Sequence, residues 1–233
     1  MLDCISVENM RRSDALTIAN YVPSLELMGR AARGVFLAAS WRGRVAIVVG
    51  SGNNGGDGFA LACILQQEGI PCEVFTISEK KSADSAFYAE KTKKMGVKIT
   101  NFTHSCLQGF DMIVDCLLGT GFRGEPRENC RAAIEAINAS NAFVISVDIN
   151  SGMDGDTGES VFAVRSDLTV TVGYVKRGLV TSAAGRQVKK LVCADIGIVL
   201  EKEEWKLLLP DEPPVPNSLP CPPWLDPNII NAI

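Results

Sequence analysis

The sequence predicts an α/β fold in three layers, with a mostly parallel sheet between two layers of helices. Short runs of aliphatic and β-branched residues alternate with helical segments along most of the 233-residue chain. These runs are almost continuously apolar, which is typical of strands covered on both faces. Strand–helix–strand units at this spacing require right-handed crossovers. The expected architecture is therefore a Rossmann-like αβα fold.

Seven segments predict the strands of the sheet: 44–50, 72–77, 97–100, 111–119, 142–149, 167–173 and 191–197. The third is the weakest, because it is short and polar. Three segments between them predict helices: 58–69, 82–96 and 127–140. Gly69 and Gly96 stand where a helix commonly ends in the left-handed conformation.

The two ends of the chain differ from this pattern. Residues 6–20 and 24–40 predict N-terminal helices that bury an apolar face on the sheet or on a partner subunit, and we expect a homodimer. Eight of the 11 prolines fall within 210–227. Because proline interrupts helices and sheets, residues 210–233 predict an extended tail behind a single domain of residues 1–209.

Composition excludes several classes of protein. The 23 basic and 27 acidic residues give a net charge of −4, which argues against a nucleic-acid-binding surface. No apolar run approaches the roughly 20 residues of a membrane span, and the N-terminus lacks the order of a signal peptide. The eight cysteines form no C-x-x-C pair, which favours free thiols and a cytoplasmic location. His104 is the single histidine, so a zinc site or a Ser-His-Asp triad is disfavoured.

Three polar, glycine-rich loops follow predicted strands: GSGNNGGDG (50–58), DCLLGTGFRGE (115–125) and DINSGMDGDTG (148–158). Ligands of open parallel sheets bind where loops leave the carboxyl ends of the strands. Glycines there let backbone amides approach phosphate oxygens closely. Three such loops predict one composite site.

The first loop contains the G-x-G-x-x-G pattern of dinucleotide-binding proteins at Gly50, Gly52 and Gly55. An NAD-dependent oxidoreductase is therefore an alternative, with Glu79 as the ribose-binding acid. A P-loop is excluded because no Gly-Lys-Ser/Thr follows.

Asp115 and Asp148 each lie at or near the end of an apolar strand, where a charge is costly unless it is paired or used. We expect both to bind ligand or to act in catalysis. Asp57, at the start of a helix, is also explained by compensation of the helix dipole, which would keep it ionised.

In this order and spacing, NNGGDG, DCLLGTGFRG and DINSGMDGDTG resemble the loops of the NAD(P)H-hydrate epimerase family, the YjeF N-terminal domain. LMGRAAR (27–33) and TVTVGYVKRGL (169–179) resemble two further segments of that family, so the likeness covers about residues 5–200. The resemblance implies an isomerase of metabolite repair. It would interconvert the R and S forms of hydrated NADH and NADPH (NADHX and NADPHX), before a partner dehydratase restores the cofactor.

The resemblance also implies the site residues. A potassium ion would bind Asn54, Asp115 and Ser151, since a hard cation takes oxygen ligands. Because Asp148 ends an interior strand, precedes a tight turn and takes a substrate-contacting position of the family, we expect it to be the catalytic acid and base. The substrate-binding residues implied are Asn53, Asn54, Gly55, Gly56, Asp57, Gly119, Thr120, Gly121, Phe122, Arg123, Gly124, Glu125, Asp148 and Lys176. Lys176 is expected near the mouth of the site, where it would pair with a pyrophosphate unless it forms only an exposed basic turn.

Two departures from the family pattern stand out. Asn150 replaces a proline in the third loop, which we expect to loosen the turn without removing activity. No dehydratase domain follows, so the chain is either a standalone epimerase or the first part of a longer one. A non-catalytic nucleotide-binding or scaffold module of the same fold is the remaining alternative, disfavoured because Asp57, Asp115 and Asp148 are all present.

Overall fold

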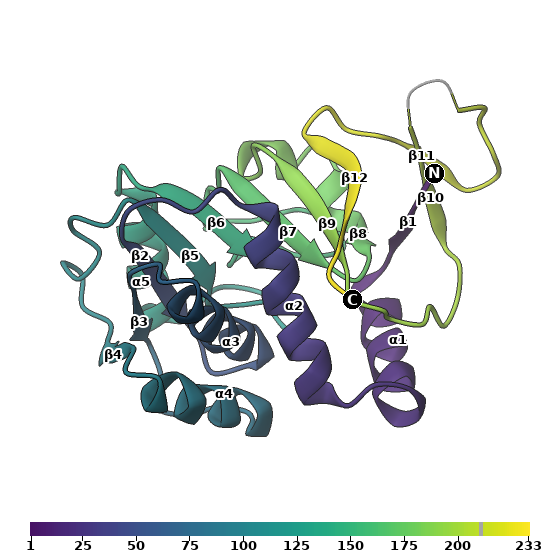
Figure 1. Ribbon diagram of the computed structural model, residues 1–233. Helices are drawn as coiled ribbons and strands as arrows, with labels where there is room; N and C mark the ends of the chain where they lie inside the picture. The colour runs from purple at the N-terminus through teal and green to yellow at the C-terminus, as the bar shows by residue number, and fades with distance from the viewer. Residues whose placement is uncertain (210–211) are drawn as a thin grey trace.

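A computed structural model of the protein describes residues 1–209 and 212–233. Its main body is an eight-stranded parallel sheet in the order β12-β9-β7-β6-β5-β2-β3-β4 (Figure 1). The strands are β2 (Val45–Val49), β3 (Cys72–Thr76), β4 (Lys98–Asn101), β5 (Met112–Cys116), β6 (Phe143–Val147), β7 (Leu168–Val172), β9 (Leu191–Asp195) and β12 (Leu225–Asn231). The seven predicted strands are confirmed, and each of them pairs in parallel with its neighbours.

Helices cover both faces of this sheet, which confirms the three-layer prediction. They are α1 (Val7–Asn20), α2 (Ser24–Ala38), α3 (Asn53–Gln67), α4 (Ala83–Lys94) and α5 (Glu128–Asn138). One apolar cluster joins α2 and α3 to inward side chains such as Ile47 and Val49. A second joins α5 to the opposite face through Val48 and Ile113. The alternation of β2 side chains between two clusters explains why its sequence is apolar throughout.

The C-terminal segment forms sheet structure that the sequence analysis did not predict. Strand β12 lies on β9 in parallel at the edge of the main sheet. Strands β10 (Trp205–Leu208) and β11 (Ser218–Pro220) join β1 (Leu2–Ile5) and β8 (Val175–Lys176) in a second, four-stranded sheet. The expectation of a purely extended tail is therefore wrong. The boundary drawn at residue 210 falls at 210–211, outside the described residues.

Helix α2 buries an apolar face as expected, whereas α1 buries the apolar Val7 and Met10 together with a polar face. The buried residues of α1 include Asn9, Ser13 and Thr17, spaced one turn apart. Asn9 donates to the carbonyl of Lys202, and the hydroxyls of Ser13 and Thr17 accept from the backbone N–H groups of residues 201 and 199. These hydrogen bonds fix α1 against the chain leading to β10.

No helix in the described part of the chain combines the length and the apolarity that a bilayer crossing requires. All eight cysteines lie among the described residues, and all eight are free thiols. Burial raises the pKa of Cys193 and of Cys130 to about 12, so these thiols are unreactive packing groups.

Candidate functional site

The sheet topology places a pocket at the carboxyl ends of β2 and β5. The chain runs from β2 to β3 and β4 on one side, whereas β5 and the later strands lie on the other. The crevice at such a switch point is where open α/β sheets bind ligands. Here a cavity of about 960 Å³ lies between the loops after β2 and β5, with α1 and α2 at its side.

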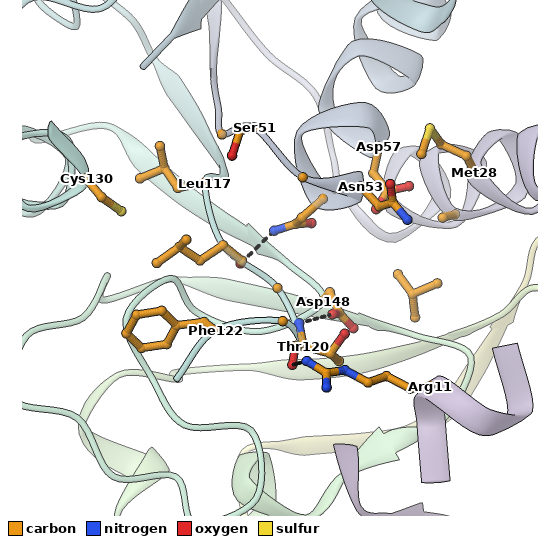
Figure 2. Close-up of a pocket in the computed structure, with 18 of the residues that line it drawn as sticks. Arg11, Met28, Ser51, Asn53, Asp57, Leu117, Thr120, Phe122, Cys130 and Asp148 are labelled. Carbon is orange, nitrogen blue, oxygen red and sulfur yellow. Dashed lines mark hydrogen bonds between the residues drawn. The ribbon is translucent and has the colours of Figure 1, made fainter. Parts of the chain in front are cut away.

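The structure brings most of the predicted substrate-binding residues to this pocket (Figure 2). Those that line it are Asn53, Asn54, Asp57, Gly119, Thr120, Gly121, Phe122, Arg123, Glu125, Asp148 and Lys176. Gly55, Gly56 and Gly124 do not line it, and neither do the predicted ion ligands Asp115 and Ser151. The three loops therefore form one site. The predicted residues that do not line the pocket belong to the same loops, where they contribute to the structure around it.

The first loop turns directly into a helix, because α3 begins at Asn53 rather than after the glycines. A Cβ on Gly50 would lie 2.0 Å from the carbonyl oxygen of Leu117, and one on Gly55 would lie 2.3 Å from that of Gly50. These glycines are thus required by close backbone packing. The N-terminus of α3, with its free N–H groups, opens on the pocket and can receive an anion.

Asp115 lies beneath the pocket and is fully buried. Its carboxylate accepts hydrogen bonds from the Ser151 hydroxyl (2.5 Å) and backbone (3.0 Å), from the Ser146 hydroxyl (2.9 Å) and from the Leu117 backbone (3.2 Å). Burial raises the pKa of Asp115, and these hydrogen bonds oppose the rise. The side chain therefore ties the second loop to the third.

Asn54 stands next to this network and has one unused oxygen. Its amide N–H donates to the Leu118 carbonyl (2.7 Å), and the Leu118 backbone N–H donates to the Ser151 hydroxyl (2.9 Å). Asn54 Oδ1 is buried without a hydrogen-bond partner in the described part of the chain. A buried acceptor left unpaired is costly, so this oxygen is suited to a cation.

Asp148 projects into the pocket from the residue after β6. Its backbone has φ 69°, a left-handed conformation that is uncommon outside glycine. Its carboxylate forms an ion pair with Lys176 (2.5 Å) and accepts from the Thr120 backbone (3.3 Å). This conformation and these contacts hold the carboxylate in place in the pocket.

Lys176 differs from both sequence-based expectations. It is only 1% exposed, so it is not a basic turn on the surface. Its ammonium donates to the Val172 carbonyl (2.5 Å) and to the Thr171 hydroxyl (3.2 Å) besides pairing with Asp148. With its ammonium engaged by three protein groups, it supports Asp148 from the floor of the pocket instead of standing at the mouth to meet a pyrophosphate.

The surroundings of Asp57 oppose the expectation that the helix N-terminus keeps it ionised. Burial raises the pKa of Asp57 well above its ordinary value of 3.8, and repulsion from Asp148 and Asp14 adds to the rise. Figure 2 shows Asp57 beside Asn53 on α3, on the other side of Asp148 from Arg11. Burial first, and then the neighbouring carboxyl groups, act against the helix dipole at this side chain.

Asn150 does not loosen its loop, contrary to expectation. The side chain is fully buried, and its amide NH2 group shares its two hydrogens among the carbonyls of Val164 (3.0 Å) and Gln187 (3.1 Å) and the Ser166 hydroxyl (3.0 Å). Its oxygen accepts from Thr169 (2.7 Å). Such a satisfied network replaces the rigidity that a proline would give.

The second loop closes the pocket through Arg123 and Glu125. Arg123 pairs with Asp156 (3.2 Å) of the third loop, and Glu125 pairs with Arg131 (3.6 Å) of α5. These exposed pairs position the loop but contribute little stability on their own.

Sequence reasoning missed four pocket residues on α1: Met10, Arg11, Asp14 and Ile18. Arg11 donates to the Thr120 carbonyl (3.1 Å), so α1 contacts the second loop directly (Figure 2). No loop motif marks these residues. The one available signal was a polar residue at every helical turn: Asn9, Ser13 and Thr17. These side chains are buried on one side of the helix, so the other side faces the pocket.

Comparisons with known proteins agree with this geometry. A sequence model of the family described as YjeF-related protein N-terminus matches residues 24–178. An NAD(P)H-hydrate epimerase of Weissella koreensis is 32% identical, covering 85% of this chain and 93% of that protein. One of Limosilactobacillus fermentum is 35% identical, covering 82% of this chain and 95% of that protein.

A bifunctional NAD(P)H-hydrate repair enzyme Nnr of Archaeoglobus fulgidus is 38% identical over 74% of this chain, which spans 37% of that enzyme's length. Among solved structures, yeast ynu0 superposes with a TM-score of 0.69, covering 76% of this chain and 83% of that one. At 22% identity this likeness shows the fold alone. The match of family model and relatives across the sheet and its three loops shows that the chain belongs to the YjeF-related protein N-terminus family.

Proposed function

We propose that this protein is an NAD(P)H-hydrate epimerase, which interconverts the R and S forms of NADHX and NADPHX. The observation that carries the proposal is a fixed carboxylate, Asp148, in a pocket that also receives the N-terminus of α3. The first group is suited to proton transfer and the second to a nucleotide phosphate. Relatives that bear the epimerase name over more than four fifths of this chain support it.

The proposed reaction breaks and re-forms one C–O bond of the hydrated ring. The hydroxyl group leaves C6 as water once it has received a proton, and the adjacent nitrogen lone pair stabilises the ring cation. Water then adds to the opposite face and gives up a proton. No redox change occurs. Asp148 is the group we assign to proton transfer, and its negative charge also stabilises the cation.

Lys176 acts through Asp148 in this scheme. Because its ammonium is buried and bound to Asp148, it orients the carboxylate and balances its charge. The negative end of the substrate, its pyrophosphate, is assigned instead to the α3 N-terminus and to the exposed Arg11 at the side of the pocket.

We also propose a potassium ion, held by Asn54, Asp115 and Ser151 as the family pattern implies. The unpaired Asn54 Oδ1 fits this role, because it needs a positive partner and is joined through Leu118 to Ser151 and Asp115. The ion would supply positive charge at the junction of the three loops. The residues themselves hold the loops in register through the hydrogen bonds described above.

Three further aspects of the proposal concern the cellular setting. A dehydratase acting on the S form is the functional partner, since bifunctional repair enzymes lie among the relatives. The free thiols favour the cytoplasm. A homodimer is proposed because apolar side chains are exposed on α1 (Ile18), between the two helices (Tyr21) and on α2 (Leu37).

The test begins with a sample enriched in the R form of NADHX. Purified protein with potassium should bring it to the R–S equilibrium mixture faster than buffer does, as followed by chromatographic separation of the two forms. The ultraviolet absorbance of the hydrate should not change. Equilibration at the rate of buffer alone would contradict the proposal. Production of NADH or NAD on adding a reducible or oxidisable substrate would favour the oxidoreductase alternative.

A further inference from the structure

Inversion at one carbon requires proton transfer on both faces of the ring. The departing hydroxyl takes a proton on one face, and the incoming water loses one on the other. Asp148 is held by Lys176, by the Thr120 backbone and by its own left-handed backbone. A carboxylate fixed in this way serves one face of a bound ring. The pocket therefore needs a second proton-transfer group.

Three other carboxyl groups at the pocket are poorly suited to this role. Glu125 is exposed and paired with Arg131. Asp84 and the exposed Glu128 lie in the first turns of α4 and α5, where a carboxylate stabilises the helix through its dipole. Asp14 and Asp57 remain, and both are surrounded closely enough by protein to hold a proton more tightly than usual.

Asp14 belongs to the side of α1 that faces the pocket, together with Met10, Arg11 and Ile18. In the described part of the chain no cation lies within ion-pair distance of its carboxyl group, and no hydrogen bond engages that group. The helix is nevertheless fixed, by the bonds of Asn9, Ser13 and Thr17. The chain thus holds a partly buried carboxyl group without a protein partner at the wall of the pocket, where a bound substrate can contact it.

The charged groups around Asp14 come from every element that meets there. Lys176 approaches from β8 of the second sheet, Asp148 from the end of β6 and Asp57 from α3, and Arg11 lines the pocket one turn earlier on α1. Burial raises the pKa of Asp14, Lys176 opposes the rise and Asp148 adds to it. Asp14 and Asp148 are therefore near enough to influence each other, yet they come from different walls of one pocket.

We propose that Asp14 is a second catalytic carboxyl group of this site, which serves the face of the hydrated ring that Asp148 does not reach. The proposal rests on the epimerase function proposed above. Asp14 precedes residues 24–178, the range matched by the family model, and so comes from an element outside that range.

The two carboxyl groups divide the proton transfers. In one direction, protonated Asp14 gives its proton to the C6 hydroxyl group, the C–O bond breaks, and water and the ring cation form. A water molecule on the opposite face then forms the new C–O bond and passes a proton to the Asp148 carboxylate. In the reverse direction the roles exchange. Exchange with solvent returns the proton before the next turnover, so atoms and charge balance.

Asp57 is the competing candidate, and its position argues for another role. It lies one turn from Asn53 and Asn54 at the N-terminus of α3, the end of the pocket assigned to phosphate. The experiment therefore includes Asp57→Asn beside Asp14→Asn. Glu8→Gln is the matched control, since Glu8 is an exposed acid on α1 paired with Arg12.

We expect Asp14→Asn to lower kcat about 100-fold, as loss of a general acid or base does, and to leave KM within about threefold. Glu8→Gln should behave as wild type. Asp14→Asn should also unfold at an equal or higher temperature at pH 7. An acid whose pKa is raised on folding destabilises the fold once pH exceeds its ordinary value of 3.8, so removing that acid relieves the cost.

An unchanged kcat in Asp14→Asn would overturn the assignment, and so would a raised KM at constant kcat. A large loss of kcat in Asp57→Asn with none in Asp14→Asn would transfer the role to Asp57. These outcomes require an active wild type. If wild-type protein does not equilibrate the two hydrates at all, the epimerase function itself fails, and the two failures are thereby distinguished.

Discussion

Asp115 and Asp148 stand on neighbouring strands of the same sheet but have opposite surroundings. Asp115 is fully buried within β5, and its oxygens accept four hydrogen bonds, from Leu117 in loop two, Ser146 in β6 and Ser151 in loop three. Asp148 lies just past the end of β6, with one ion pair, one backbone donor and an open side toward the pocket. Asp115 pairs with Ser146, so two positions along the strand separate the buried carboxylate from the one to which we assign proton transfer.

This difference predicts where a mutation acts. Removing the buried carboxylate leaves several donors without an acceptor, which costs stability. Removing the pocket carboxylate leaves most of the fold intact and costs rate. The following predictions test that division, from the largest expected effect to the smallest.

Asp148→Asn should lower kcat about 10²–10⁴-fold, because the amide cannot exchange a proton with the ring or with water. The fold should persist, since asparagine tolerates the left-handed backbone at φ 69° and its oxygen can still accept from Lys176. Rates of R–S equilibration and thermal unfolding of the purified variant measure both effects. Asp226→Asn, which alters a partly exposed acid paired with Lys190, is the control. A wild-type rate in Asp148→Asn would move the chemistry elsewhere.

Asp115→Asn should instead lower the free energy of unfolding by about 1–3 kcal/mol for each hydrogen-bond donor left unsatisfied. One of the two oxygens becomes an N–H group that faces donors from Ser151 and Ser146. Urea unfolding gives the cost. Loss of activity without loss of stability would show that Asp115 acts on the substrate or ion more than on the fold.

Most of the sheet could be predicted because its strands are apolar and its crossovers are short. Strand β12 was missed because Pro227 and its neighbours argue against sheet, yet an edge strand with an irregular register admits them. Strands β1 and β10 pair residues about 200 positions apart, as Leu2 with Leu207, which no local pattern indicates.

The part of the site that lies on the three loops could be predicted, because those loops carry recognisable sequence motifs. The three loops meet as expected, since parallel strands end at one edge of the sheet. The burial of Lys176 could not be foreseen, because its partner Asp148 is distant in sequence and YVKRGL resembles an exposed turn. Asp14 was missed because the orientation of α1 is set by side-chain hydrogen bonds to residues 199–202. No apolar stripe in the sequence indicates which side of this helix faces the pocket.

Potassium tests the Asp115 side of the comparison separately, because the proposed ion ligands include Asp115 but not Asp148. At about ten times its dissociation constant, bound potassium should stabilise the protein by about 1.4 kcal/mol, from RT ln(1 + [L]/Kd). Thermal unfolding in potassium chloride and in tetramethylammonium chloride of equal ionic strength measures the difference. Asn54→Ala, which removes the unpaired oxygen, should abolish it. An equal response to potassium in both proteins would contradict this site.

Arg11→Ala should give the smallest effect, a rise in KM of a few-fold with kcat nearly unchanged. Arg11 is exposed, and its hydrogen bond to the Thr120 carbonyl is of a kind that contributes about 1 kcal/mol. Its proposed pairing with the substrate pyrophosphate should weaken as salt concentration rises, since exposed charges are screened. Arg12→Ala, which breaks only an exposed pair with Glu8, is the matched control. Thr120 also donates to Asp148, so Arg11 and Asp148 contact the same residue. A fall in kcat as large as that of Asp148→Asn would mean that α1 sets the position of the catalytic carboxylate through Thr120, and the division between binding and chemistry at this pocket would have to be redrawn.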